Sequence, residues 1–290
     1  MRLAILSRNP FLYSTKRLHE TAVSMGHTAQ VLDTLTLAAQ MRRRLPQANR
    51  FPFDAIIPRI GTSITKVGVR VVRQLEQAGL PTSATANSIA KSRNKLISHI
   101  LMQKAGLPTP QTIVVRQPAQ MAAAIDAVGL PLIVKLSEGT QGRGVLLAHT
   151  WQAAMALGQR LGQFGNPLLV QRFVAEAQGR DIRIVVVGGR SVAAMERTAA
   201  PGEYRANLHL GGTAVSYQPD AALTEIAVRA AEMHQLGCCG VDIIFSHEGP
   251  LLLEVNSSPG LEGIEMASGV DVAAAIISYL EERLAAYPSS

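Results

Sequence analysis

The sequence has few cysteines, few aromatic residues and no long apolar run. Its only cysteines, Cys238 and Cys239, are adjacent and cannot form a disulfide framework. We therefore expect both to act as small apolar residues. Aromatic residues make up 4% of the chain, which leaves few stacking platforms for single-stranded nucleic acid. No apolar run approaches the ~20 residues of a membrane span, and Leu3–Leu6 is too short for a signal peptide. These absences predict a cytoplasmic protein that binds no membrane, and they disfavour nucleic acid as a partner.

Positive charge is concentrated in the first third of the chain. Residues 1–90 contain 12 Lys and Arg against 4 Asp and Glu, whereas residues 91–290 contain 16 against 17. A nucleic acid, an acidic peptide or a small acidic substrate would each explain a basic face. For the triplet Arg42–Arg44 alone, a solvated charged loop around Met41–Arg50 is a strong alternative explanation.

Strands and helices alternate over residues 1–90. This alternation predicts an α/β unit with a doubly wound parallel sheet, in which ligands bind beyond the carboxyl ends of the strands. The expected strands are Leu3–Leu6, Gln30–Leu32 and Ala55–Ile57, and the expected helices are Lys16–Met25 and Val67–Ala78. Turns after the first and third strands make Arg8, Asn9, Arg59 and Thr62 candidate substrate-binding residues. Ordinary strand-end turns explain these residues equally well.

A glycine-rich loop joins two expected strands in residues 132–148. The first strand, Leu132–Leu136, contains Lys135, and the loop Ser137–Gly144 follows it. Closely spaced glycines allow backbone amides to approach phosphate. This loop lacks the Gly-Lys-Ser/Thr of a Walker loop, and many hairpins are glycine-rich. A lysine among Ile, Val and Leu needs an anionic partner, however, and so favours a phosphate site.

A hairpin near the C-terminus carries three oxygen-bearing side chains. Two apolar runs, Val241–Phe245 and Leu251–Val255, flank a polar Gly/Pro turn, which is typical of a β-hairpin. Glu254 and Asn256 share a strand face, and antiparallel pairing brings Asp242 opposite them. Two carboxylates and an amide oxygen suit a hard cation such as magnesium bound with a nucleotide. The alternative is a turn aspartate and an exposed strand carboxylate. We disfavour it because an unpaired charge within an apolar run is costly.

Other expected elements complete the chain. An irregular stretch between strands, Pro201–Gly212, is long enough to suggest function and contains Arg205, Asn207 and His209, although His209 is equally well explained as structural. The further expected helices are Ser92–Ala105, Pro118–Val128, Ala221–Leu236 and Val270–Ala286.

These motifs occur in an order that resembles the ATP-grasp superfamily: Lys135, the loop, Asp181-x-Arg183, Arg205-x-Asn207 and Asp242…Glu254-x-Asn256. Over essentially its full length the chain is similar to RimK-type α-L-glutamate ligases. The stretches PRIGTSIT, KLSEGTQGRGV and LEVNSSPGLEGIE carry this resemblance, the last most specifically. It implies an α+β ATP-grasp fold with ATP held between two antiparallel sheets. The implied units are an N-terminal pre-ATP-grasp domain at 1–90, a central subdomain at 91–174 and a C-terminal subdomain at 175–290.

The resemblance also implies the roles of individual residues. Lys135 and Arg205 would be the catalytic cations. Two magnesium ions, with manganese as an alternative, would be bound by Asp242, Glu254 and Asn256. The chain departs from the family at Arg172, where members often have Glu, and at Leu210, where many have a basic residue. The residues implied to bind ATP are Lys95, Lys135, Ser137, Glu138, Gly139, Gln141, Gly142, Gly144, Arg172, Phe173, Val174, Asp181, Arg205 and Asn207.

By the same resemblance, the protein is expected to be an ATP-dependent carboxylate–amine ligase. Such enzymes activate a carboxylate as an acyl phosphate, and an amine then attacks it to give an amide, ADP and phosphate. The expected substrates are glutamate and the acidic C-terminal tail of a small-subunit ribosomal protein, and the expected state is a homo-oligomer. An amino-acid or cofactor ligase with another acceptor and a non-catalytic ATP-binding module are the alternatives.

Overall fold

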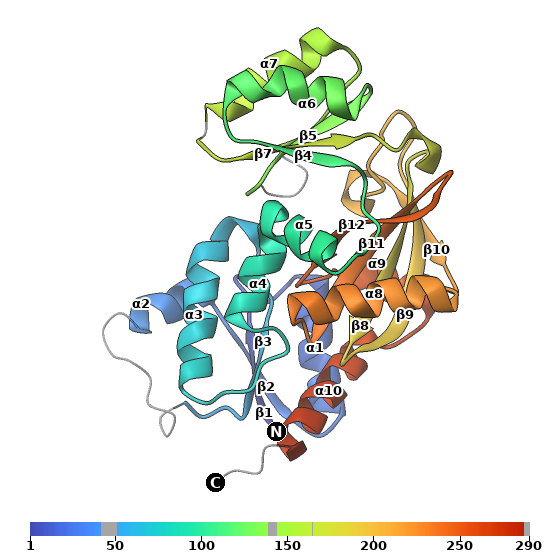
Figure 1. Ribbon diagram of the computed structural model, residues 1–290. Helices are drawn as coiled ribbons and strands as arrows, with labels where there is room; N and C mark the ends of the chain where they lie inside the picture. Colours follow the sequence, from blue (N-terminus) through green and yellow to red (C-terminus); the bar gives the residue numbers. More distant parts are fainter. Residues whose placement is uncertain (42–50, 139–143, 164, 287–290) are drawn as a thin grey trace.

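The computed structural model describes residues 1–41, 51–138, 144–163 and 165–286 (Figure 1). Its N-terminal unit contains a parallel sheet with strand order β2-β1-β3, which confirms the predicted sheet type. Apolar residues of β1 such as Leu3 and Ile5 are fully buried because helices cover both faces of the sheet. The elements of this unit are β1 (Arg2–Leu6), α1 (Tyr13–Ser24), β2 (Thr28–Leu32), α2 (Thr34–Met41), β3 (Ala55–Pro58), η2 (Thr62–Ile64), α3 (Thr65–Gln77) and α4 (Ala86–Arg93).

A helix break follows this unit, so the prediction of one helix over Ser92–Ala105 is wrong. Helix α4 ends at Arg93, and α5 (Lys95–Lys104) begins after Asn94. Asn94 has an extended backbone (φ −94°, ψ 106°), and its side chain accepts a hydrogen bond from the Ile97 N–H. This is the arrangement of an N-cap, which satisfies a free amide of the new helix. The break places Lys95 in the first turn of α5. The expected domain boundary after residue 90 falls inside α4.

The central unit, at the top of Figure 1, is an antiparallel sheet with strand order β4-β7-β5-β6. Two helices cover one face, and a core of its own includes Met121, Leu132, Leu161 and Val170. The second of these helices, α7, was not predicted. The elements are β4 (Thr112–Val115), η3 (Pro118–Gln120), α6 (Met121–Val128), β5 (Leu132–Leu136), β6 (Val145–Ala148), α7 (Trp151–Gly162) and β7 (Leu168–Arg172).

The C-terminal unit is a five-stranded antiparallel sheet with order β10-β9-β8-β11-β12. It shares its core with the N-terminal unit, since Val71 and Ile184 belong to one buried cluster, and Leu3 and Ile277 to another. The elements are η4 (Ala175–Ala177), β8 (Arg180–Val187), β9 (Arg190–Thr198), η5 (Leu208–Leu210), β10 (Thr213–Ser216), α8 (Ala221–His234), β11 (Cys238–Ser246), β12 (Gly249–Asn256), α9 (Glu262–Ser268) and α10 (Val272–Ala286).

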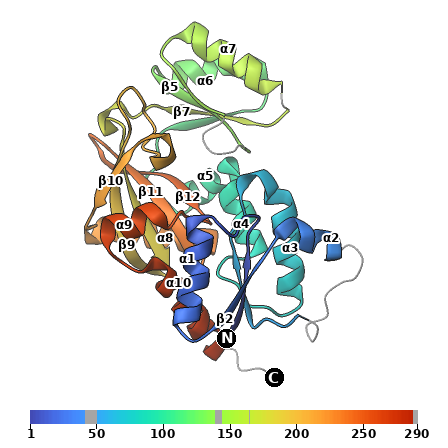
Figure 2. The same cartoon turned by 180° about the vertical axis from the view of Figure 1, so that it is seen from behind.

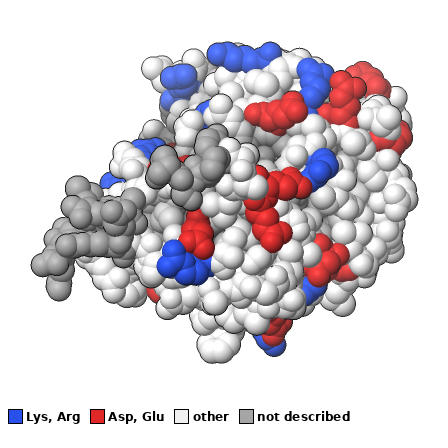
Figure 3. Space-filling view, turned by 90° about the horizontal axis from the view of Figure 1, so that it is seen from below, with Lys and Arg blue, Asp and Glu red and all other residues white. Residues whose placement is uncertain are grey.

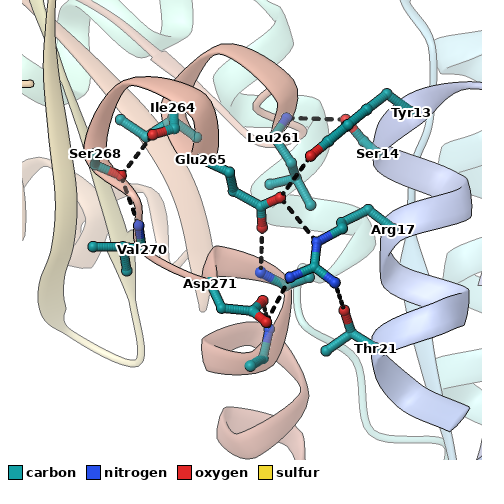
Figure 4. Close-up of polar contacts among 12 residues, drawn as sticks. Tyr13, Ser14, Arg17, Thr21, Leu261, Ile264, Glu265, Ser268, Val270 and Asp271 are labelled. Carbon is teal, nitrogen blue, oxygen red and sulfur yellow. Dashed lines mark hydrogen bonds and ion pairs between the residues drawn. The ribbon is translucent and has the colours of Figure 1, made fainter. Parts of the chain in front are cut away.

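A polar network fastens these two units together where α1 meets α9 and α10 (Figures 2 and 4). The Glu265 carboxylate, whose side chain is only 8% exposed, accepts hydrogen bonds from Tyr13 Oη (3.2 Å), Arg17 Nε (3.1 Å) and the Ala273 N–H (3.0 Å). Arg17 also forms an ion pair with Asp271 at 2.6 Å. The N-terminal unit therefore holds the segment that follows β12.

Two surface properties bear on possible partners. Among the described helices, none alone is long and apolar enough to cross a membrane; only α9 and α10 taken together meet the criteria of length and composition, with a 107° bend between them. On the face that Figure 3 shows, basic and acidic side chains are interspersed. The Arg42–Arg44 triplet lies outside the described residues.

Candidate active site

The hairpin of β11 and β12 pairs as the sequence predicts. Asp242 lies opposite Glu254, and Gly240 lies opposite Asn256. A β-bulge follows, because Ile243 pairs with Leu252 and leaves Leu253 as an extra residue; bulges often re-aim side chains next to active sites. Glu254 is exposed, although Leu252 and Val255 are buried. Glu254 is thus an exposed strand carboxylate, the alternative that its apolar neighbours disfavoured, because the strand alternates between core and surface.

Asp242 lies in a buried network of two carboxylates and two guanidinium groups. Its carboxylate, in a residue 3% exposed, accepts from Arg183 Nε (2.7 Å) and Nη2 (2.6 Å), and from Arg197 Nη2 at 3.0 Å. Arg197 also binds Asp181 through two hydrogen bonds of 2.7 Å. Burial alone would raise the pKa of Asp242, but the two arginines hold it below its ordinary value. Burial, and then repulsion by Asp242, raises the pKa of Asp181 to about 6.

Four cationic side chains form a row from the N-terminal unit to the central unit. Besides burial, repulsion by Arg93 lowers the pKa of Arg59 and of Lys95, and repulsion by Lys95 lowers the pKa of Lys135. Attraction by Glu254 acts in the opposite direction on Arg93, Lys95 and Lys135. Lys135 Nζ donates to Gln171 Oε1 at 2.6 Å. Burial, opposed by Glu254 and assisted by Lys95, lowers the pKa of Lys135 to about 8. In the row, defined here as these four residues, three cations interact with the single carboxylate of Glu254, and the excess of positive charge favours a further anion.

The glycine-rich loop begins beside this row. Lys95 N–H donates to Ser137 O at 2.8 Å, and Asn94 Nδ2 approaches Glu138 Oε1 at 3.4 Å. At the far end, Gly144 has φ +88°, and a Cβ there would lie 2.9 Å from the Leu136 side chain. Glycine is therefore required at that position. The candidate residues Gly139, Gln141 and Gly142 lie outside the described residues.

The strand expected to hold adenine uses part of its backbone within the central unit. The N–H of Arg172 donates to Gln111 O (2.9 Å), and the N–H of Phe173 donates to Pro131 O (3.2 Å). The Arg172 side chain forms an ion pair with Glu176 at 2.8 Å. Those two amides, and the Val174 carbonyl, which accepts from the Ala177 N–H at 3.3 Å, are therefore already paired within the protein.

Arg205 and Asn207 lie in a loop that reaches the central unit. Tyr204 Oη donates to Val145 O at 3.0 Å, and its ring lies edge-on to Phe173 at 6.0 Å. Arg205 stacks over Tyr204 and forms an ion pair with Glu203 at 2.7 Å. The hydrogen bond from Arg205 lowers the pKa of Glu203 to about 2. Asn207 Oδ1 accepts from the His209 N–H.

The candidate substrate residues of the N-terminal unit separate into two groups. Arg8 is exposed and approaches Ser63 Oγ at 3.4 Å, and Asn9 Oδ1 accepts from the Phe11 N–H. Thr62 begins the short helix η2. Arg59 instead turns inward, where Nη2 donates to Pro259 O at 2.8 Å. Only Arg59 of this set joins the cationic row.

The hairpin carries oxygen donors of the kind that a hard cation binds, with Glu254 and Asn256 on one strand face. Two of the three are already engaged: Asp242 would share its oxygens with Arg183 and Arg197, and Asn256 Oδ1 accepts from the Ser258 N–H at 3.0 Å. Among the described residues, no group of three or more His, Cys, Asp and Glu side chains is arranged to hold a metal, so the amide of Asn256 would have to contribute.

A cavity of about 280 Å³ lies elsewhere, between β9, β10, α8 and α9. Small, hydroxyl-bearing and apolar side chains line it, including Ser191, Ser216 and Val270. We assign it no role in the chemistry because none of the candidate residues contributes to its lining.

Three side chains of the site are not predicted from the sequence: Arg93, Gln171 and Arg197. Arg93 directly precedes the N-cap residue Asn94, and this cap is the one local sequence feature that could have indicated Arg93. Gln171 supports Lys135 across β5 and β7, and Arg197 lies opposite Asp181 across β8 and β9. These last two contacts depend on strand pairing and have no local signal.

A four-stranded antiparallel sheet that carries Lys135 and a five-stranded antiparallel sheet that carries the acidic hairpin are the arrangement of an ATP-grasp protein. The chain belongs to the RimK-like ATP-grasp family: the family model "RimK-like ATP-grasp domain" matches residues 92–280, and "RimK PreATP-grasp domain" matches residues 1–89. Membership of this family makes the protein an ATP-dependent ligase.

Individual relatives agree with this placement. The chain is 47% identical to the "Probable alpha-L-glutamate ligase 2" of Pseudoalteromonas atlantica, over 97% of this chain and 95% of the relative. It is 44% identical to the "Probable alpha-L-glutamate ligase 1" of Shewanella amazonensis, over 97% and 96%. The structure of the ATP-grasp ligase PsnB with a minimal precursor, Mg and ADP has a TM-score of 0.71 at 18% identity and covers 96% of both chains, which shows the shared fold.

Proposed function

We propose that this protein is an α-L-glutamate ligase that joins the amino group of glutamate to a carboxylate of an acidic acceptor. The observation that carries the proposal is the cationic row around Glu254, directly opposite Asp242 in the hairpin. Such an arrangement can neutralise a triphosphate and the phosphoryl group that it transfers. The names of the relatives at 44–47% identity support glutamate as the amine donor.

The nucleotide would lie against the lysines of the cationic row, and its metal would lie against the acidic hairpin. Lys95 and Lys135 would bind the phosphates, and Asp242, Glu254 and Asn256 would bind magnesium, as two ions or with manganese in its place. A divalent ion there supplies charge neutralisation during phosphoryl transfer. Arg205 would bind the transferred group from the opposite loop.

The acceptor carboxylate attacks the γ-phosphorus of ATP, and ADP leaves as the bond to the β-phosphate breaks. The glutamate amine then attacks the acyl carbon of the resulting acyl phosphate. It forms the amide, and phosphate leaves. The side chains of this site bind and orient the reactants, and no covalent bond to the protein is required.

We further propose that the acceptor is the acidic C-terminal tail of a small-subunit ribosomal protein, modified in the cytoplasm by a homo-oligomer. The excess of basic residues in positions 1–90 supports an acidic acceptor. Exposed Arg8, with Asn9 and Thr62 nearby in the fold, would attract the tail.

The test is ADP release from ATP and magnesium, screened against single amino acids with and without the ribosomal acceptor. The proposal predicts release that requires glutamate and acceptor together, and an acceptor that gains glutamyl residues by mass spectrometry. Transfer of glutamate to a different acceptor would refute only the assignment of the ribosomal protein as acceptor. ADP release that requires another amino acid would refute glutamate as the amine substrate. Tight ATP binding without turnover would favour a non-catalytic ATP-binding module.

A further inference from the structure

Two arginines at one end of the cationic row have no carboxylate partner. Arg59 donates Nη2 to Pro259 O at 2.8 Å, and Arg93 donates Nη2 to Ile60 O at 2.9 Å. Both are partly buried, and within the described residues neither forms an ion pair. Glu254 attracts Arg93, but the two do not come within ion-pair distance. Two neighbouring guanidinium groups without a counter-ion are unfavourable, because desolvation and mutual repulsion add.

Further donors beside these arginines lack an acceptor. Arg93 Nε, Ser257 Oγ and Ser258 Oγ are buried and have no hydrogen-bond partner within the described residues. The two serines directly precede Pro259, whose carbonyl binds Arg59. Buried donors without an acceptor are uncommon in proteins and require water or a ligand.

There is open space next to this cluster. Gly61 follows the Ile60 carbonyl that holds Arg93, and Gly260 follows the Pro259 carbonyl that holds Arg59. Both glycines are exposed, and a Cβ at either would meet no heavy atom within 4 Å. No side chain therefore fills the space directly over these two glycines.

We propose that Arg59, Arg93, Ser257 and Ser258 form a carboxylate-binding subsite, and that it receives the terminal carboxylate of the acceptor. Guanidinium groups and hydroxyls are the donors that suit a carboxylate. The position follows from the hydrogen bonds: Arg93 and Arg59 bind the loops that follow β3 and β12, whereas the Lys95 N–H binds Ser137 O at the start of the glycine-rich loop, where phosphate is expected. The choice of the acceptor as the source of this carboxylate rests on the proposed function.

The subsite is tested by binding, which separates it from the question of turnover. A fluorescent Glu-rich peptide with a free C-terminal carboxylate is compared with the same peptide as a C-terminal amide, in the presence of ADP and magnesium. We expect the native protein to bind the free acid about tenfold or more tightly than the amide. Arg93→Met and Arg59→Met should abolish this difference, and Ser258→Ala should reduce it.

Arg283→Met is the matched control, because Arg283 also donates to a backbone carbonyl, that of Thr82, but lies on α10 outside the row. This control should retain the full preference for the free acid. The melting temperature provides a second readout. Each of the three arginines donates one hydrogen bond to a backbone carbonyl, so the three variants should lose a similar, small amount of melting temperature. A drop for Arg93→Met and Arg59→Met far beyond that of Arg283→Met would mark both arginines as structural and overturn the proposal.

Titration with free L-glutamate distinguishes the two sources of carboxylate. If glutamate binding depends on Arg93 and the acid and amide peptides bind equally, the assignment to the acceptor is overturned. If neither ligand depends on Arg93, the subsite itself is overturned. A clear preference for the acid peptide would support the subsite even if glutamate transfer were absent.

Discussion

The strongest quantitative prediction concerns the protonation of Lys135. Its pKa is lowered to about 8, first by burial, and its ammonium group donates to Gln171 at 2.6 Å. If Lys135 binds the phosphates of ADP, only the protonated form contributes. The protonated fraction falls from about nine-tenths at pH 7 to about one-tenth at pH 9, so the dissociation constant for ADP should rise about fivefold to tenfold.

Lys135→Met should remove both the charge and the pH dependence. A charge-assisted hydrogen bond contributes about 1.5–3 kcal/mol, so the variant should bind ADP about 10–150-fold more weakly at pH 7. Its affinity should then change little up to pH 9. Isothermal titration calorimetry with ADP and magnesium measures both effects.

Lys91→Met is the matched control for this experiment. Lys91 also donates to a glutamine, Gln235, at 2.9 Å, but does so on the exposed surface of α4. Its replacement should leave both the affinity and the pH profile unchanged. The reasoning is refuted if the native protein binds ADP equally well at pH 7 and pH 9, or if Lys135→Met keeps the native profile.

Three further predictions follow from the same structure. Glu254→Gln should abolish ADP release while changing stability by no more than about 0.5 kcal/mol, since its side chain is exposed; circular dichroism with an activity assay checks both. Glu265→Gln should reduce the free energy of unfolding in urea by about 1–3 kcal/mol, because three donors lose a charged acceptor. Glu282→Gln, in an exposed ion pair with Arg190, should cost less than about 1 kcal/mol, and equal losses would contradict the difference in burial. Raising salt should increase KM for a Glu-rich acceptor more than KM for ATP, because exposed charges are screened over ~8 Å, and Arg8→Ala should reproduce that shift.

The sequence was sufficient for the local geometry of the hairpin. Two apolar runs that flank a Gly/Pro turn predict antiparallel strands with Asp242 opposite Glu254, and the register agrees. The bulge at Leu253 could not be predicted, since it depends on how both strands pair. The exposure of Glu254 depends on which face of the sheet remains uncovered, which is a property of the whole fold.

The features of the site that could not be predicted depend on contacts between segments distant in the sequence. Arg59 was expected at a strand end, but its partner, Pro259, is 200 residues away. From the sequence, Asp242 is expected to be a free carboxylate. In the structure, Arg183 and Arg197 on nearby strands of the same sheet form ion pairs with it. The helix break at Asn94 was missed because the apolar periodicity continues across it, and only the side-chain cap reveals the new start.

The central claim is that the protein activates the acceptor carboxylate and transfers glutamate to it. The most direct measurement uses an acidic acceptor peptide whose terminal carboxylate carries a heavy oxygen isotope, incubated with ATP, magnesium and glutamate. Mass spectrometry of both products should find a glutamyl-extended peptide and phosphate that has gained one labelled oxygen, because an acyl phosphate passes an oxygen of the carboxylate to phosphorus. Unlabelled phosphate, or ADP release without a glutamyl product, would contradict the account.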